Sequence, residues 1–305
     1  MFLRRPILIL AVLALPALQV LLLTAVACGG SERAVVTGAV VVDDFDDSVR
    51  VGAARRIVSL NPVVTEFLFA AGVGPRVVGR THWDHYPPAA EAVPDLGNGI
   101  GPNVEAVLGA RPDLVILYAS PSNRRAATGL QQAGVRTLTV RTDRIADLAR
   151  LAGLYAAVTG DSAGLAVVDT VMRSVDAVRT LPRPARAPRV FWSLFDGGSQ
   201  LYTLGRGSFM HELLEVAGVT NVFADIAPPS AQVSLEEVIR RNPDIVLVGP
   251  ATAARVRASS AWMAVPAVRA GRLAIADSAL VGRPGMRLGE AARHIRRLVV
   301  GDSVR

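Results

Sequence analysis

One pattern of about sixteen residues occurs twice in the chain, and this internal repeat constrains the fold more than any other feature. The first copy, PNVEAVLGARPDLVIL, covers 102–117, and the second, VSLEEVIRRNPDIVLV, covers 233–248. The two copies align without a gap, so that Pro112-Asp113 falls on Pro243-Asp244. Each copy predicts a short helix, a Pro-Asp turn and an apolar strand. A chain that makes this unit twice is expected to form two similar lobes.

The segments around each copy show the same alternation of strands and helices. The strand RIVSL (56–60) precedes the helix NPVVTEFLFAAG (61–72), and the strand RVFWSLF (189–195) precedes the helix SFMHELLEVAG (208–218). The strands NVFAD (221–225) and LAIAD (273–277) follow. Strands separated by helices of about ten residues indicate parallel sheets covered on both faces. We therefore expect an α/β fold of two similar Rossmann-like lobes.

The lobes are expected at 55–160 and 188–305, joined by one long helix. Apolar residues recur at helical spacing in 161–181, and the Pro-rich stretch that follows ends the connector at residue 187. Residues 29–54 are expected to form a tether and a small β-hairpin. Its acidic stretch, Asp43 to Asp47, lacks the glycine and distal glutamate of a calcium loop and is interpreted as a solvated turn.

Residues 1–28 have the features of an export signal. Two arginines precede an apolar run, and small residues lead into Cys28, the only cysteine. A run of this length could also be a simple membrane anchor. The stretch Ala25-Val26-Ala27-Cys28 resembles the lipobox of bacterial lipoproteins, which implies an exported, lipid-anchored protein in the periplasm or at the cell surface. No intramolecular disulfide is expected.

The formal net charge of +7 raises the question of a nucleic-acid partner. The basic residues are scattered along the chain, and few aromatic residues lie between them. With an export signal in front, this pattern indicates a solvated basic surface, and no nucleic-acid partner is expected.

Several segments together resemble the substrate-binding proteins of bacterial ABC importers for metal chelates, the class in which a helical backbone joins the lobes. They are RRIVSLNPVVTEFLFAAG, YPP, NVEAVLGARPDLVI, SFMHELLEVAGVTNVFAD and VSLEEVIRRNPDIVLV. The resemblance implies a ligand cleft between the lobes and partners in a permease and an ATPase. HYPPAA and VSLEEV are most similar to the cobalamin-binding members, so cobalamin or a related corrinoid is the expected ligand. Gly97-Asn98-Gly99 and Ser230 stand where those members carry tryptophan, which leaves haem and ferric siderophores as alternatives.

Glu105 and Glu236 occupy the same position in the two copies of the repeat. In the resembled family, a glutamate on each lobe docks into arginine pockets of the permease, which implies this role for both. A glutamate in the first helical turn also complements the helix dipole, and this role alone could explain Glu105. In the second copy Ser234 and Glu237 already have capping-box spacing, which leaves Glu236 without that role.

Aromatic residues near strand ends are the candidate ligand contacts, because open α/β sheets bind ligands at the carboxyl ends of their strands. A flat macrocycle is held best by large aromatic faces. The resemblance places Tyr86 and Tyr118 on aromatic contact positions of the cobalamin binders and Tyr202 near a third. For Trp192 and Phe195, burial as strand residues is the alternative. The candidates are Trp83, Tyr86, Tyr118, Trp192, Phe195 and Tyr202.

Metal binding and catalysis find little support in the sequence. His82 and His85 have a spacing that could hold a metal, yet a direct metal site would need further ligands from the second lobe. One of them could instead coordinate a haem iron. The G-x-S-x-G pattern at 160–164 does not follow a predicted strand, so it is no nucleophile elbow, and Gly97 to Gly101 lacks the order of a nucleotide loop. We expect neither a resident metal nor cofactor, and no enzyme activity.

Overall fold

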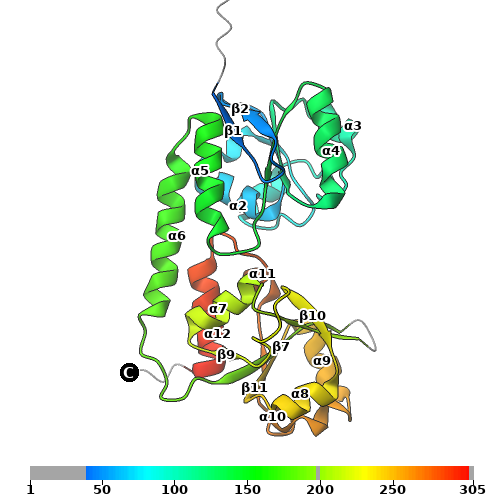
Figure 1. The fold of residues 1–305 in the computed structure, drawn as a ribbon, viewed down its shortest axis with the longest axis vertical. Coiled ribbons are helices and arrows are strands. Elements are labelled where there is room, and N and C mark those ends of the chain that lie inside the picture. Colours follow the sequence, from blue (N-terminus) through cyan, green and yellow to red (C-terminus); the bar gives the residue numbers. More distant parts are fainter. Residues whose placement is uncertain (1–38, 197–199, 302–305) are drawn as a thin grey trace, which may run out of the picture. The chain divides into compact units, whose positions relative to one another are not determined.

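The computed structural model describes residues 39–196 and 200–301, and Val40–Arg305 forms one compact unit. The expected signal segment, Cys28 and the first part of the tether lie outside the described residues. Within the compact unit, two α/β lobes both pack against helix α6 (Ala163–Arg179), as Figure 1 shows. In the described part of the chain, no helix is both long enough and apolar enough to cross a bilayer.

The first lobe contains a parallel sheet with the strand order β4-β3-β5-β6. Its strands are nearly continuous apolar runs because helices cover both faces. The sheet elements and their helices are β3 (Ile57–Leu60), α2 (Pro62–Ala70), η1 (Gly74–Arg76), β4 (Val77–Gly79), η2 (Pro88–Ala92), α3 (Val104–Gly109), β5 (Leu114–Tyr118), α4 (Pro121–Gln132), β6 (Arg136–Val140) and α5 (Asp147–Thr159).

The second lobe repeats this order, with β9, β7, β11 and β12 as its parallel strands. The fold class expected from the repeat is thereby confirmed. The elements are β7 (Arg189–Asp196), β8 (Leu201–Leu204), α7 (Phe209–Ala217), β9 (Thr220–Asn221), β10 (Ser230–Val233), α8 (Leu235–Arg241), β11 (Ile245–Val248), α9 (Pro250–Ala258), η3 (Trp262–Ala264), α10 (Pro266–Arg269), β12 (Leu273–Ile275), α11 (Ser278–Val281) and α12 (Leu288–Val300).

The second sheet is mixed, which differs from the expectation of parallel sheets alone. Strand β8 pairs antiparallel with the end of β7, and β10 pairs antiparallel with β8. Of the segment expected as the strand NVFAD, only Asn221 lies in β9, because its side chain accepts a hydrogen bond from the Phe223 backbone and turns the chain. β10 has no strong apolar alternation, and its pairing with β8 makes it a strand.

The repeated Pro-Asp turn has the same structural role in both lobes. In the first, the Asp113 carboxylate accepts hydrogen bonds from the backbone N–H groups of Arg55 and Arg56, at 2.9 and 3.2 Å. In the second, the Asp244 carboxylate accepts one from the backbone N–H of Arg189 at 2.9 Å. The Arg56 and Arg189 side chains then donate to carbonyls at the end of the preceding repeat helix. Each copy of the repeat is therefore hydrogen-bonded, through its helix end and its turn, to the start of the first strand of its lobe.

The connection between the lobes is the predicted long helix, with a helix packed beside it. α6 covers 163–179 within the expected 161–181, and α5 precedes it as an additional helix. A single hydrophobic cluster extends from Phe67 in the first lobe through Val175 in α6 to Ile295 in α12. Gly289 allows α12 to approach α6 closely, because a Cβ there would lie 2.1 Å from the Ser174 hydroxyl oxygen. The lobes thus share one core along α6.

The interpretation of the acidic turn as solvated is wrong for Asp43. Strands β1 (Val40–Val42) and β2 (Ser48–Arg50) form an antiparallel hairpin, and Asp43 in its turn is only 4% exposed. Its carboxylate accepts hydrogen bonds from the Thr139 backbone and hydroxyl in β6. The turn therefore covers the outer edge of β6, which would otherwise present unpaired backbone groups.

Candidate functional site

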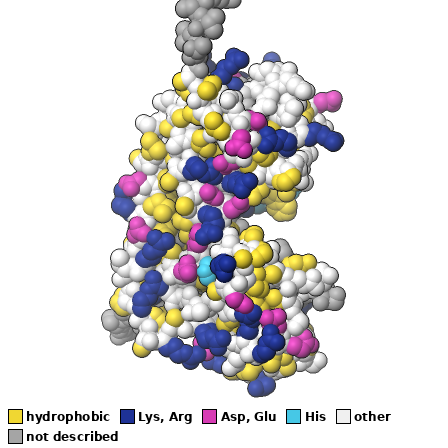
Figure 2. All heavy atoms as spheres, in the orientation of Figure 1, with side chains coloured by type: hydrophobic (Ala, Val, Ile, Leu, Met, Phe, Trp, Pro, Cys, Tyr) yellow, Lys and Arg dark blue, Asp and Glu magenta, His cyan; other side chains and the backbone are white. Residues whose placement is uncertain are grey.

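A cavity of about 980 Å³ lies between the two lobes. Figure 2 shows a hollow there, on the side away from α6, with hydrophobic side chains at its border. Its lining includes residues at the carboxyl ends of parallel strands in both lobes, as expected for ligand sites on open α/β sheets. Asn61 and Thr142 contribute from the first lobe, and Ser193, Gly249 and Ala276 from the second.

Three of the aromatic residues predicted from the sequence line this cavity: Trp83, Tyr118 and Trp192. Trp83 is 53% exposed, and the centre of its ring lies 4.4 Å from the centre of the His82 ring. Trp192 is only 3% exposed and belongs to the shared core, so it both fills the core and borders the cavity. The exposed indole of Trp83 is therefore the aromatic surface most accessible to a ligand.

The Tyr118 phenol is held in its neutral form. Its hydroxyl donates a 2.6 Å hydrogen bond to Asp143, which also lines the cavity. Burial, followed by the Asp143 carboxylate, raises the pKa of Tyr118 to about 12. At neutral pH this side chain can stack on a ligand, but it is a poor source of a phenolate for binding a metal.

Arg144 and Arg283 also line the cavity. Neither arginine was predicted from the sequence. Arg144 follows β6, so the strand-end rule used for the aromatic residues would have found it. Arg283 follows the helix α11 and not a strand, so the same rule would not have found it. Its Nη1 donates to the Trp83 carbonyl at 3.1 Å, across the two lobes. These guanidinium groups and the Asp143 carboxylate are the charged groups among the described lining residues.

Buried polar groups complete the wall. The Asn61 side chain caps α2 through the Val63 N–H at 3.0 Å and donates to the Thr142 hydroxyl at 3.1 Å. The Ser193 hydroxyl is buried at the cavity and has no hydrogen-bond partner among the described residues. A buried hydroxyl without a partner is costly, so a ligand acceptor or donor at this position would be favourable.

Two other predicted contacts, Tyr86 and Tyr202, are not among the described residues that line the cavity. Tyr86 is covered by the Arg287 guanidinium, which lies 4.1 Å from the centre of its ring. Tyr202 lies in β8, and its hydroxyl contacts Gln200 at 3.2 Å. Phe195 pairs with Tyr202 through the backbone, and its side chain lies outside the described residues.

The two histidines considered as metal ligands are also absent from the cavity lining. His85 is exposed and lies 3.2 Å from Glu91. His82 packs on Trp83. Within residues 39–196 and 200–301, no group of three or more His, Cys, Asp or Glu side chains could hold a metal ion.

Glu105 and Glu236 are exposed on equivalent helices of the two lobes. Each follows the first residue of its helix, and the helices α3 and α8 are capped by the side chains of Asn103 and Ser234. The Ser234 hydroxyl accepts from the Glu237 backbone, whereas the Glu237 carboxylate binds Arg241 instead of returning to the cap. Hydrogen bonds from its own backbone and from Ser234 lower the pKa of Glu236. Glu236 therefore also interacts with the helix start, a role the capping-box spacing had assigned to Glu237.

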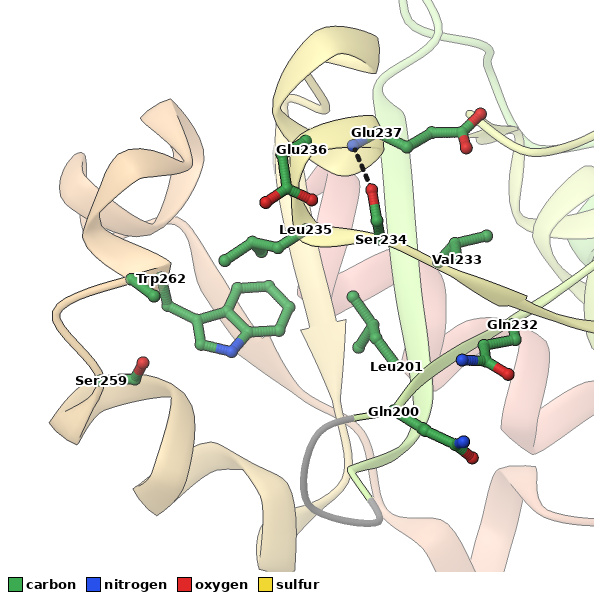
Figure 3. A pocket seen from close by; sticks show the side chains of 11 residues that line it. Gln200, Leu201, Gln232, Val233, Ser234, Leu235, Glu236, Glu237, Ser259 and Trp262 are labelled. Carbon is green, nitrogen blue, oxygen red and sulfur yellow. Dashed lines mark hydrogen bonds between the residues drawn. The ribbon is translucent and has the colours of Figure 1, made fainter.

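Glu236 borders a second hollow, of about 780 Å³, on the surface of the second lobe. Figure 3 shows Glu236 and Glu237 pointing to different sides of α8, with Leu235 and the Trp262 indole near Glu236. An anionic group beside an apolar floor suits a guanidinium, whose flat faces are weakly hydrated. The surface around Glu236 can thus receive a basic side chain of a partner.

Comparison with known proteins identifies related chains. Residues 57–280 match the family described as periplasmic binding protein. A curated relative from Salmonella paratyphi A (strain ATCC 9150 / SARB42), named Vitamin B12-binding protein, is 31% identical over 199 residues, covering 64% of this chain and 73% of the relative. Another, from Bacillus subtilis (strain 168), is named uncharacterized ABC transporter substrate-binding lipoprotein YvrC. It is 29% identical over 262 residues, covering 82% of this chain and 81% of the relative.

A solved structure has the same arrangement of lobes. It is the periplasmic heme-binding protein RhuT from Roseiflexus sp. RS-1 in apo form, with a TM-score of 0.73 and 25% identity. The match covers 81% of this chain and 98% of that chain. This similarity agrees with the two-lobed α/β fold described above.

Proposed function

Because this chain belongs to the periplasmic binding protein family, whose members bind solutes and are not enzymes, we propose that it captures a corrinoid, cobalamin or a close relative, for an ABC importer. The observation that carries the proposal is the cavity between the lobes, with Trp83, Tyr118 and Trp192 on its wall. Its volume of about 980 Å³ is near the upper end of ordinary ligand pockets, which suits a macrocycle. The curated relative named for vitamin B12 supports the same ligand class.

Haem is the second candidate, and a specific observation favours it. Arg144 and Arg283 on the cavity wall could pair with the carboxylates of a haem. A relative of known structure is also named for haem. Haem iron, however, is usually held by His, Cys, Met or a tyrosine phenolate. Among the described lining residues there is no histidine or cysteine, Tyr118 is held protonated, and Met210 is the one remaining residue of these ligand types. A corrinoid does not depend on a protein ligand for its metal, so it remains the first proposal, ahead of haem and ferric siderophores.

Absorption spectroscopy tests the ligand. Full-length protein carrying Cys28→Ser is incubated with cyanocobalamin, dicyanocobinamide, hemin or a ferric catecholate, and the spectrum is recorded after gel filtration. We expect a corrinoid to co-elute in stoichiometric amount. Co-elution of hemin or the catecholate in place of both corrinoids would transfer the proposal to that ligand.

Trp83→Ala is expected to weaken corrinoid binding by about 1–2 kcal/mol, or roughly 5- to 30-fold, because the cavity loses a stacking surface. Tyr86→Ala is the comparison, since Tyr86 has a similar size but lies outside the cavity lining and should change affinity little. Titration by tryptophan fluorescence or calorimetry measures both. Equal losses in the two variants would mean that the ligand also covers the Tyr86 surface.

Substrate-binding proteins of ABC importers act with a permease and an ATPase. We propose that Glu105 and Glu236, one on each lobe, form the docking contacts with the permease. Both are exposed, both stand at the start of equivalent helices, and Glu236 borders an open hollow. The effect expected on uptake is large and is treated in the Discussion.

The proposed membrane attachment rests on Cys28, which lies outside the described residues. The lipobox-like sequence and the relative named as a lipoprotein support a lipid on this cysteine. Labelling cells with a tagged fatty acid tests it: a Cys28→Ser variant that still carries the label would rule out this attachment.

A further inference from the structure

The first helices of the two lobes carry equivalent glutamates that the proposed function does not use. α2 contains Thr65-Glu66-Phe67-Leu68, and α7 contains His211-Glu212-Leu213-Leu214. These helices follow equivalent strands, β3 and β7, although α7 comes after the added strand β8. In both lobes the glutamate reaches across to the other lobe.

Glu66 of the first lobe is bound by a loop of the second. It is 2% exposed, and its Oε2 accepts a hydrogen bond from the Met286 backbone at 2.9 Å. Arg283 Nη1 lies 3.9 Å from Oε1 of the same carboxylate. At Gly285 there is no room for a side chain, because a Cβ would lie 2.1 Å from Glu66 Oε2. The loop 283–286 therefore packs directly against the buried Glu66 carboxylate.

Glu212 of the second lobe makes the reciprocal contact. Its Oε2 accepts a hydrogen bond from the Ile145 backbone at 2.8 Å, and its Oε1 pairs with the Arg144 guanidinium. The Glu212 side chain is 18% exposed. The loop that contains Arg144 and Ile145 follows β6, just as the loop 283–286 follows β12 and α11. Each lobe therefore contributes one glutamate and receives the other.

We propose that Glu66 and Glu212 form a reciprocal clamp that sets the separation of the lobes and positions Arg144 and Arg283 on the cavity wall. The two arginines that line the cavity are the same two that the glutamates bind, so the clamp and the wall share their charged groups. Opening the cleft would separate the Glu66 carboxylate from the Met286 N–H and the Arg283 guanidinium, its partners in the other lobe. Burial is also the main cause that raises the pKa of the Glu66 carboxyl. The ligand-positioning half of this inference rests on the proposed function.

The separation of the lobes can be measured without any ligand. Spin labels at Thr128→Cys in α4 and Ala254→Cys in α9, both exposed positions, are placed in full-length protein carrying Cys28→Ser. The double variant Glu66→Gln/Glu212→Gln is expected to broaden the interlabel distance distribution and shift it, with smaller changes in each single variant. Glu215→Gln is the matched control, because Glu215 lies on α7 and its carboxylate pairs with His211 of its own lobe, at 3.4 Å. A distribution in the double variant that superimposes on that of the parent would overturn the clamp.

Gly285 provides a second test that removes no charge. Gly285→Ala should disturb the distance distribution in the parent, because its Cβ meets the Glu66 carboxylate, and should add nothing further in a Glu66→Ala background. Its φ is not in the left-handed region, so alanine imposes no backbone strain by itself. Equal effects in both backgrounds would contradict the proposed contact.

Binding of two probes, dicyanocobinamide and hemin, tests whether the clamp positions the two arginines for a ligand. Loss of the clamp is expected to weaken binding of the probe that the parent accepts about tenfold, because each arginine loses its fixed position. Unchanged affinity in the double variant would overturn the positioning role. If the parent binds neither probe, the proposed function fails, and the distance measurements still decide the clamp.

Discussion

Uptake through the importer is expected to fall to background when Glu105 and Glu236 are both replaced by Ala, while ligand affinity stays unchanged. Removing a carboxylate that becomes buried against basic groups in a complex weakens binding strongly, so each single variant should lose roughly 30-fold in docking. Two contacts on one body reinforce each other through effective concentration. Uptake in cells and ligand titration of purified protein, measured side by side, separate docking from capture.

The neighbouring Glu237 supplies the matched control. Its carboxylate is already paired with Arg240 and Arg241 within α8, so Glu237→Ala should reduce uptake far less than Glu236→Ala. Charge reversal, Glu105→Lys or Glu236→Lys, should be worse than alanine, because lysine would repel the arginines that the docking proposal expects in the permease. Normal uptake by the Glu105→Ala/Glu236→Ala variant would refute docking and leave both residues as partners of the helix dipole.

Asp43→Ala is expected to lower the free energy of unfolding by about 2–4 kcal/mol, a large share of the stability of an ordinary domain. The buried carboxylate accepts hydrogen bonds from the Phe45 and Asp47 backbones at 2.9 and 3.1 Å. It also accepts from the Thr139 backbone and hydroxyl at 2.9 and 2.6 Å. Removing the carboxylate leaves these N–H and O–H donors without an acceptor, in a place that water reaches poorly.

Denaturant unfolding of Asp43→Ala and Asp47→Ala gives the comparison. Asp47 belongs to the same turn, but it is more exposed and pairs with the surface residue Arg124 at 3.2 Å. Its removal should cost less than about 1 kcal/mol. If the two variants lose equal stability, the turn is held by its surface ion pairs and not by the buried carboxylate.

Much of the fold follows from local patterns. The repeat predicted two α/β lobes, and the structure explains it through Asp113 and Asp244, which bind the start of the first strand in each lobe. The connecting helix was predicted from its apolar spacing. Strands β8 and β10 were missed, because antiparallel pairing across a turn, and not apolar periodicity, makes Ser230–Val233 a strand.

The candidate site divides in the same way. The rule that ligands bind at strand ends placed Trp83, Tyr118 and Trp192 on the cavity from their positions in the chain alone. The same rule included Tyr86 and Tyr202, because it cannot tell which side of a loop or strand a ring will occupy. The Arg287 guanidinium covers the Tyr86 ring, and Tyr202 lies in β8, outside the described cavity lining.

By itself, the sequence determined the lobes, the connecting helix and the family, because these depend on residue order and on periodicity within a few turns. Only the tertiary structure decided the partners of its acidic residues. Asp43 binds a strand 96 residues away, and Glu66 binds a backbone group 220 residues away. An exposed and a buried carboxylate look the same in a sequence. Which one is buried depends on the element that packs over it, and that element is brought there by the folding of the whole chain.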